Sequence, residues 1–200
     1  MLPGYLLERI QAHSFNRSTK YLDAFSEFKI STELSKLNYG LILKDSVYSC
    51  QMFPIIQQGF LTHGALPNYF KQNIEKSVRK TLDFSIDYFL DIQPENMIIV
   101  MEDCGQPMRE LIDNLHPYAL LSIVKQILVG FMVAETALEF EHRDLHSGNV
   151  LLQRCNHEYI CYQLRRKVIR VPSFGFRVKI IDTTFSRVRI SRFNFICIFI

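Results

Sequence analysis

Residues 140–152 read FEHRDLHSGNVLL, and this stretch decides the fold that the sequence predicts. It holds the triplet His142-Arg143-Asp144, and Asn149 follows the aspartate by five positions. A carboxylate such as that of Asp144 can orient and deprotonate a hydroxyl group, and an amide oxygen can bind a hard cation such as Mg²⁺. The spacing therefore indicates a short polar loop in which an acid-base group and a metal ligand face one site.

The loop follows a long predicted helix over residues 117–140. Pro117 suits a first helical turn, and the apolar residues after it recur at the three-four spacing of one helix face. We expect this helix to be rigid and to present the loop from its end. The predicted buried face comprises Leu120, Ile123, Val124, Ile127, Leu128, Phe131, Ala134, Ala137 and Leu138.

A second carboxylate follows an apolar segment further along the chain. Residues 178–184 read VKIIDTT, so Asp182 ends a predicted strand over residues 176–182 and can reach the same cation. Phosphoryl transfer needs mainly a carboxylate that positions the acceptor hydroxyl and oxygen ligands that hold Mg²⁺ on the phosphates. The HRDxxxxN pattern after a long helix, followed by an apolar strand that ends in aspartate, matches the signature set of protein kinases.

The remaining predicted elements surround this centre and together indicate an α+β fold. An amphipathic helix is expected at residues 23–37, and β-leaning segments are expected at 41–60, 96–102 and 159–171. Residues 70–93 are polar and then aromatic, which indicates a loop or a peripheral element.

The polar loop, the segment VAETALEFEHRD that leads into it and the later segment IIDTTFSRV resemble the haspin family, a divergent branch of the eukaryotic protein kinases. That family has a similar FEHRDLHxGNVLL loop, including the histidine that stands here as His146. It carries an Asp-Tyr-Thr triplet where this chain has Asp182-Thr183-Thr184. The resemblance extends over residues 23–197, and the last part of that range fits the family's hairpin after the triplet.

The resemblance implies a partial protein-kinase fold with ATP and Mg²⁺ as cofactors. Residues 1–102 would be the remnant of an N-terminal lobe with its αC helix and strands, and residues 103–200 the first half of a helical C-terminal lobe. The implied site residues are Asp144 as catalytic base, His142 and Arg143 in the same triplet, Glu27 as the αC glutamate, Glu102 and Gly105 at the nucleotide-binding hinge, and Asn149 and Asp182 as metal ligands that also hold the nucleotide.

The activity that the resemblance implies is that of a nuclear, chromosome-associated serine/threonine kinase. Such an enzyme phosphorylates a threonine of a histone tail in mitosis, so its contact with nucleic acid would be indirect, through chromatin. No window of the sequence approaches the roughly 20 apolar residues of a bilayer span, so no membrane is expected.

Two features of the family are missing from this sequence. None of the eight glycines forms a GxGxxG loop. The family places its ATP-binding lysine about two dozen residues before the αC glutamate, and counting back from Glu27 reaches Met1-Leu2-Pro3. The chain also stops at Ile200, which indicates a product truncated at both ends. We therefore expect weak or no phosphotransfer by this chain.

Three alternatives stay open. A kinase-like protein without catalytic activity would act by binding a partner. A small-molecule phosphotransferase is indicated by DLHSGNVL, which is similar to the loop of aminoglycoside and choline kinases, although those usually read His-Gly-Asp before it. Direct nucleic-acid binding would use Arg165, Arg166, Lys167 and Arg170.

The composition is that of a globular chain, with 48% apolar and 22% charged residues among 200. Five cysteines at irregular spacings indicate neither a disulfide framework nor a zinc site. Residues 193–200 read FNFICIFI, which is uncharged and strand-prone, so we expect this segment to pair within a hairpin or to promote oligomerisation.

Overall fold

The computed structural model describes residues 10–14, 19–63, 95–189 and 195–197. The predicted peripheral element at residues 70–93 lies outside the described residues. The described elements are β1 (Ile10–Ser14), α1 (Thr19–Ser35), η1 (Lys36–Asn38), β2 (Leu41–Leu43), β3 (Ser46–Ser49), β4 (Ile56–His63), β5 (Glu95–Met101), β6 (Gln106–Pro107), α4 (Met108–Leu111), η2 (Ile112–Asn114), α5 (Pro117–Leu138), β7 (Val150–Arg154), β8 (Tyr159–Arg165), β9 (Lys167–Pro172), β10 (Phe176–Ile180), β11 (Arg187–Arg189) and β12 (Phe195–Cys197).

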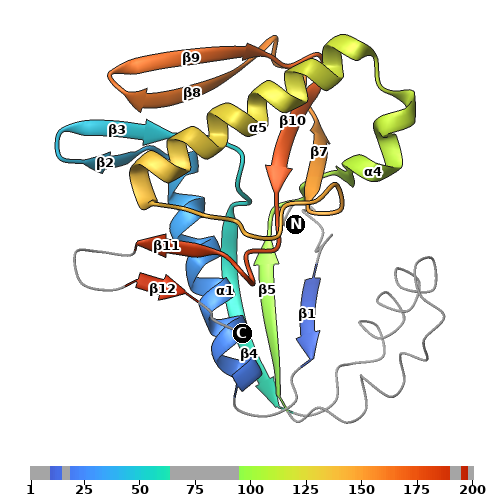
Figure 1. Cartoon of the computed structure of the whole chain (residues 1–200). Helices are drawn as coiled ribbons and strands as arrows, with labels where there is room; N and C mark the ends of the chain where they lie inside the picture. The colour runs from blue at the N-terminus through green and yellow to red at the C-terminus, as the bar shows by residue number, and fades with distance from the viewer. Residues whose placement is uncertain (1–9, 15–18, 64–94, 190–194, 198–200) are drawn as a thin grey trace, which may run out of the picture.

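The first sheet has the strand order β1-β5-β4 with antiparallel pairs, and α1 packs against it (Figure 1). Gly59 on β4 allows the close approach of the helix, because a Cβ atom there would lie 2.5 Å from the ring of Phe28. Ala24, Met97 and Ile99 are buried together between helix and sheet. These contacts hold α1 against the sheet, and Glu27 lies midway along the helix.

The helix α5 packs on two further antiparallel sheets, with the strand orders β10-β7-β6 and β2-β3-β8-β9. Figure 1 shows α5 crossing in front of β10, while the hairpins β2–β3 and β8–β9 extend to the same side of the molecule. At Gly130 the helix closely approaches Met52, since a Cβ atom there would lie 2.4 Å from the Met52 sulfur. The main core lies between these elements and the C-terminal half of α1.

The buried face of α5 differs from the predicted one. Val124 and Leu128, both expected in the core, are 48% and 64% exposed. Gln126 is fully buried instead, because its side-chain amide donates to the carbonyl of Phe176 at 3.0 Å and accepts the N–H of Val178 at 3.0 Å. Gln126, a polar residue that binds the buried backbone of β10, therefore lies on the buried face of the helix, which apolar spacing alone does not predict.

Both ends of α5 have local causes. His116 lies at the N-cap, where its Nδ1 accepts the N–H of Tyr118 at 3.3 Å, and Pro117 occupies the first turn as predicted. At the other end Glu139 adopts a left-handed backbone with φ +49°, and its N–H donates to the carbonyl of Glu135 at 2.9 Å. This turn redirects the chain into residues 141–149.

The α+β fold class is confirmed, as are most of the predicted elements. α1 begins at Thr19 rather than at residue 23, and the pairing of β11 with β12 confirms the predicted hairpin after the Asp-Thr-Thr triplet. The strand β7 was not predicted. The division at residue 102 stays a prediction, and hydrogen bonds between β3 and β8 cross it.

One helix in the described part of the chain, α5, is long and apolar enough to cross a membrane by length and composition alone. The prediction that no segment reaches this length is therefore wrong for residues 117–138. Core helices of soluble proteins pass the same test, and one face of α5 packs on β8, β9 and β10.

Candidate active site

Residues 141–149 form the predicted polar loop between α5 and β7. Asn149 is buried, and its side-chain Nδ2 donates to the backbone carbonyl of Asp144 at 3.1 Å. The backbone N–H of Asn149 donates to the carbonyl of His146 at 2.9 Å. These two bonds fold the loop back on itself, so the five-residue spacing places Asp144, whose side chain is partly exposed, beside Asn149.

His142 connects this loop to the strand that leads to Asp182. The imidazole is buried, its Nδ1 accepts the N–H of Asp144 at 3.4 Å, and its Nε2 donates to the carbonyl of Ile181 at 3.1 Å. Burial lowers the pKa of His142 below its ordinary value of 6.5, despite the opposing hydrogen bond to Ile181. His142 is therefore a neutral linker between the two segments, consistent with the bond that it accepts at Nδ1.

A backbone hydrogen bond brings Asp182 to the same place. The N–H of Ile181 donates to the carbonyl of Asn149 at 3.0 Å, so the residue before Asp182 is tied to both His142 and Asn149. Asp182 itself has a left-handed backbone with φ +64°. The structure thus brings Asp144, Asn149 and Asp182 together around one position, from segments that are more than 30 residues apart in the chain.

The donor set fits a hard divalent cation. Nδ2 of Asn149 is bonded to Asp144, and Oδ1 of Asp182 accepts the hydroxyl and the N–H of Thr184 at 2.8 and 3.4 Å. Oδ1 of Asn149 and Oδ2 of Asp182 then have no hydrogen-bond partner among the described residues. No group of three His, Cys, Asp or Glu side chains able to hold a metal occurs in those residues. Two oxygen ligands suit Mg²⁺, which keeps waters and phosphate oxygens in its shell.

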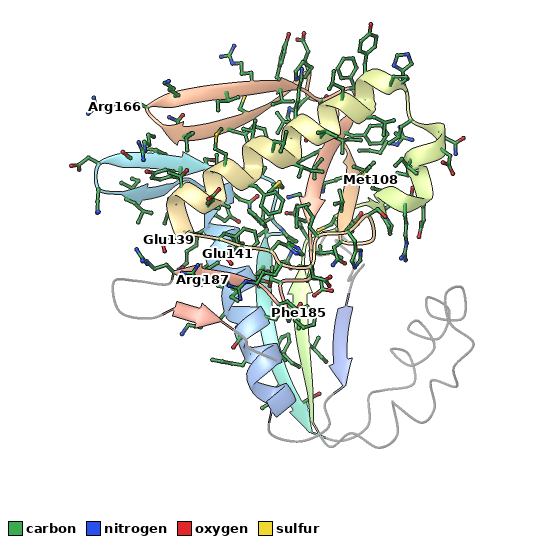
Figure 2. All side chains as sticks on the ribbon, viewed as in Figure 1. Met108, Glu139, Glu141, Arg166, Phe185 and Arg187 are labelled. Atoms are coloured by element: carbon green, nitrogen blue, oxygen red, sulfur yellow. The ribbon has the colours of Figure 1, made fainter. Side chains whose placement is uncertain are left out.

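Arg143 points away from this position and into an ion-pair network. Its backbone is left-handed with φ +67°, and its Nε and Nη2 donate to Oε2 of Glu141 at 2.9 and 2.7 Å. Glu141 also accepts from Nη1 of Arg187 at 2.6 Å, and Glu139 pairs with Arg187 and Arg189. Hydrogen bonds from Arg143 and Arg187 lower the pKa of Glu141. Figure 2 shows Glu139, Glu141 and Arg187 gathered where the loop meets β11, so the network fixes the loop to the segment after Asp182.

Glu27 reaches the site from α1. Its side chain is only 2% exposed, and its Oε2 accepts the hydroxyl of Thr184 at 3.0 Å. The neighbouring Thr183 donates to the backbone carbonyl of Glu27 at 3.3 Å and shares a hydrogen bond of 2.9 Å with the hydroxyl of Ser31. The Thr184 hydroxyl, which also bonds Asp182 at 2.8 Å, therefore links the predicted αC glutamate to the predicted metal ligand.

The strand that precedes this helix is β1. It pairs with β5 in the register Ile10↔Val100 to Ser14↔Asn96, so it lies only 13 to 17 residues before Glu27. The family's lysine position, about two dozen residues before Glu27, therefore stays a prediction. The sequence of β1, IQAHS, contains no lysine.

Glu102 and Gly105 lie in the segment that follows β5. Oε1 of Glu102 accepts the N–H of Ile55 at 2.8 Å, and its backbone N–H donates to the carbonyl of the same residue at 3.0 Å. Gly105 has φ +80°, and a Cβ atom there would lie 2.2 Å from the carbonyl oxygen of Leu152. Only glycine fits this contact, in which the segment lies directly on the backbone of β7.

Lys179 is a further residue of this region, and the sequence reading did not single it out. Its side chain is 1% exposed, and its Nζ donates to Oε1 of Glu102 at 2.5 Å and to the carbonyl of Phe53 at 3.5 Å. This ion pair joins the strand that carries Asp182 to the segment after β5. The sequence did contain a signal for this pair, because Lys179 lies among the apolar residues of VKII, and a buried ammonium group needs a partner.

The comparisons with known proteins point to one family. A family model described as "Haspin like kinase domain" matches residues 22–198. The "Serine/threonine-protein kinase haspin" of Mus musculus is 50% identical over 66 residues, which are 33% of this chain and 9% of the mouse protein. The haspin homolog of Arabidopsis thaliana is 46% identical over 67 residues, 34% of this chain and 11% of that protein. The homolog of Drosophila melanogaster is 40% identical over 68 residues, 34% and 12% of the two chains.

The fold and the loop are those of a partial protein-kinase domain, with mixed helices and antiparallel sheets around an HRDxxxxN loop. The chain belongs to the haspin-like kinase domain family. The matched part of the chain spans between 9% and 12% of the length of the three relatives.

Proposed function

We propose that the chain acts as a protein-kinase-type phosphotransferase, which moves the terminal phosphoryl group of ATP to a serine or threonine hydroxyl of a protein. The supporting observation is the pair of hydrogen bonds through Ile181, which joins His142 and Asn149 to the segment of Asp182. These bonds place the backbone of Asp182 beside the loop that carries Asp144 and Asn149, and phosphoryl transfer requires a carboxylate and oxygen metal ligands that lie close together.

In this proposal each residue has a defined task. Asp144 accepts the proton of the acceptor hydroxyl and orients that group toward the phosphorus atom. Asn149 and Asp182 would hold a divalent cation, which would supply charge neutralisation of the phosphates. His142 holds the backbone of Asp144 next to that of Ile181, and Arg143 anchors the loop through Glu141.

The substrate and the location are also proposals. The resemblance to haspin favours a threonine of a histone tail as acceptor and a nuclear, chromosome-associated protein. The printed names of the relatives support a serine/threonine specificity for those proteins. The histone acceptor rests on the family alone.

A second candidate is a kinase-like protein that binds without catalysing transfer. The favouring observation is β1, the strand before α1, whose sequence IQAHS holds no lysine to pair with the phosphates. Single electrostatic contacts of this kind are worth about 10²–10³ in rate by analogy with oxyanion-hole donors, so their loss brings transfer near the detection limit.

One comparison separates the two candidates. Transfer of labelled phosphate from ATP to a histone-tail peptide is measured for wild type, Asp144→Asn and Asp113→Asn, the last an exposed aspartate of η2 that serves as a matched control. The proposal expects transfer by wild type and the control, and a loss of about 10²-fold or more in Asp144→Asn. No transfer by a wild-type sample with a cooperative thermal transition would favour the binding candidate.

Nucleotide binding gives a second, independent readout. We expect ATP·Mg²⁺ to raise the Tm of the wild-type chain, and Asp182→Asn to abolish this shift more completely than Asn149→Ala. The carboxylate carries the charge that attracts the cation, whereas the amide contributes only a dipole. The opposite order in a thermal-shift series would contradict the assigned roles.

A further inference from the structure

Two hairpin tips place four cations at one end of the sheet β2-β3-β8-β9. Lys44 lies in the tip between β2 and β3, while Arg165, Arg166 and Lys167 form the tip between β8 and β9. The register Val47↔Arg165 puts the two tips at the same end. We call these four residues the hairpin-tip surface.

The hairpin-tip surface is exposed and positively charged. All four side chains are exposed, and no salt bridge joins them to a carboxylate in the part of the chain that the structure describes. Asp45 is the acid within the two tips. In Figure 2 Arg166 lies at the outer end of its hairpin, away from Glu141 and Phe185 beside the candidate active site.

The backbone of the tips carries strain in order to hold these side chains. Lys44, Asp45 and Arg165 have φ values of +47°, +61° and +57°, in the left-handed region where hairpins normally place glycine or asparagine. The amide of Gln163 donates to the carbonyl of Arg165 at 2.6 Å and fixes that conformation. Long cationic side chains at two such positions indicate a use for the charge, because glycine would satisfy the turn without strain.

The sheet face behind the tips carries one further exposed cation. Arg170 lies on β9 opposite Cys161, and both are exposed. Val168 and Ile42 are also exposed on these strands, at 58% and 72%. The described strands β2, β3, β8 and β9 contain no aspartate or glutamate. A negatively charged partner could therefore extend from the tips across the face without meeting a carboxylate on a strand.

We propose that the hairpin-tip surface, together with Arg170, binds the phosphate backbone of duplex nucleic acid without reading its sequence. Arginine and lysine side chains neutralise phosphates and release counterions, which drives such binding. The hairpin-tip surface itself consists of cations, and the apolar side chains exposed beside it, Ile42 and Val168, are aliphatic rather than the aromatic ones that anchor proteins at membrane interfaces, so a phosphate backbone fits it better than a membrane surface. The proposal is independent of phosphotransfer, because none of its residues belongs to the candidate active site.

The test measures anisotropy of a fluorescein-labelled 20-base-pair DNA duplex with the full chain between 50 and 200 mM NaCl. The tip variant carries Arg165→Gln, Arg166→Gln and Lys167→Gln. The matched control carries Lys36→Gln, Lys125→Gln and Arg154→Gln, three exposed cations on other elements, so both variants lose the same charge. We expect the tip variant to bind at least about tenfold more weakly at 50 mM NaCl, and its salt slope to fall by about 1 per removed cation. The control should stay close to wild type.

A third variant separates charge from folding. Arg165→Gly relieves the left-handed strain, so we expect a higher Tm together with weaker DNA binding. Equal losses in the tip variant and the control would overturn the proposal, as would unchanged DNA binding in the tip variant. Tighter binding of wild type to vesicles containing phosphatidylserine than to the duplex, lost in the same tip variant, would overturn it in favour of a membrane partner.

Discussion

The two sides of the candidate active site are held by different interactions. On the loop side, backbone and imidazole hydrogen bonds join Asn149, Ile181 and His142. On the helix side, the carboxylate of Glu27 accepts the hydroxyl of Thr184. The loop side holds Asp144 and Asn149 of the HRDxxxxN motif, whereas the sequence of β1 on the other side, IQAHS, contains no lysine. The difference teaches that the motif loop can keep its hydrogen-bonded fold beside a strand that contains no lysine.

The largest expected effect concerns the ion pair of Lys179 on β10 with Glu102 after β5. Lys179→Met leaves the carboxylate of Glu102 without its ammonium partner, so we expect the free energy of unfolding to fall by about 3–5 kcal/mol. Urea denaturation measures this change. Lys125→Met, an exposed lysine on α5, is the control and should change stability little. A loss below about 1 kcal/mol would show that the pair does not fasten β10. Adding Glu102→Gln to Lys179→Met should restore part of the loss.

Core truncations compare the packing of the two sides. Leu152→Ala on β7 removes a side chain from the main core, and we expect a cost of about 3–5 kcal/mol. Ile99→Ala on β5 lies in the smaller group with Ala24 and Met97, where a cavity can collapse more readily, so we expect about 2–3 kcal/mol. Urea denaturation of both variants tests the order. An equal or reversed order would mean that both sides are packed alike.

A pair of hydroxyl deletions sharpens the comparison further. Thr184→Val removes the hydroxyl that lies between the carboxylates of Glu27 and Asp182, and a hydrogen bond to a charged group contributes about 1.5–3 kcal/mol. Ser186→Ala removes the bond from its hydroxyl to the carbonyl of His142, a neutral pair worth about 1 kcal/mol. We expect Thr184→Val to be the more destabilising substitution in thermal unfolding. The reverse result would indicate that Glu27 is held mainly by other groups.

The smallest expected effect is a pH dependence from the loop side. Burial lowers the pKa of His142 in the folded chain, so below its ordinary value of 6.5 the unfolded chain binds more protons. The stability that the neutral imidazole contributes is therefore complete above pH 6.5 and is lost as the pH falls further. We expect the free energy of unfolding to fall less between pH 7 and 5 in His142→Gln than in wild type. An identical decline in both would contradict a buried neutral His142.

Much of the site was predictable because its motif is local. Asp144 and Asn149, five residues apart, are joined by a hydrogen bond within one turn. Asp182 follows the apolar strand β10, whose end is bonded to this turn through Ile181. The roles of these residues stay predictions. The position of Glu27 on a helix was also predictable, since its segment has helical spacing.

Other features depend on partners that are distant in the chain. The side chain of Gln126 bonds the backbone of Phe176 and Val178, 50 and 52 residues away, and apolar periodicity carries no information about these bonds. The pairing of Lys179 with Glu102 spans 77 residues.

The segment from Asp182 to Arg187 is anchored along most of its length. Thr183 bonds Glu27, Ser186 bonds the carbonyl of His142, and Arg187 exchanges two backbone hydrogen bonds with Glu141. An outward swing of the whole segment that carries Asp182 would break these bonds. Compounds that act by displacing this aspartate should therefore bind slowly, while compounds that accept its present position should meet no such barrier.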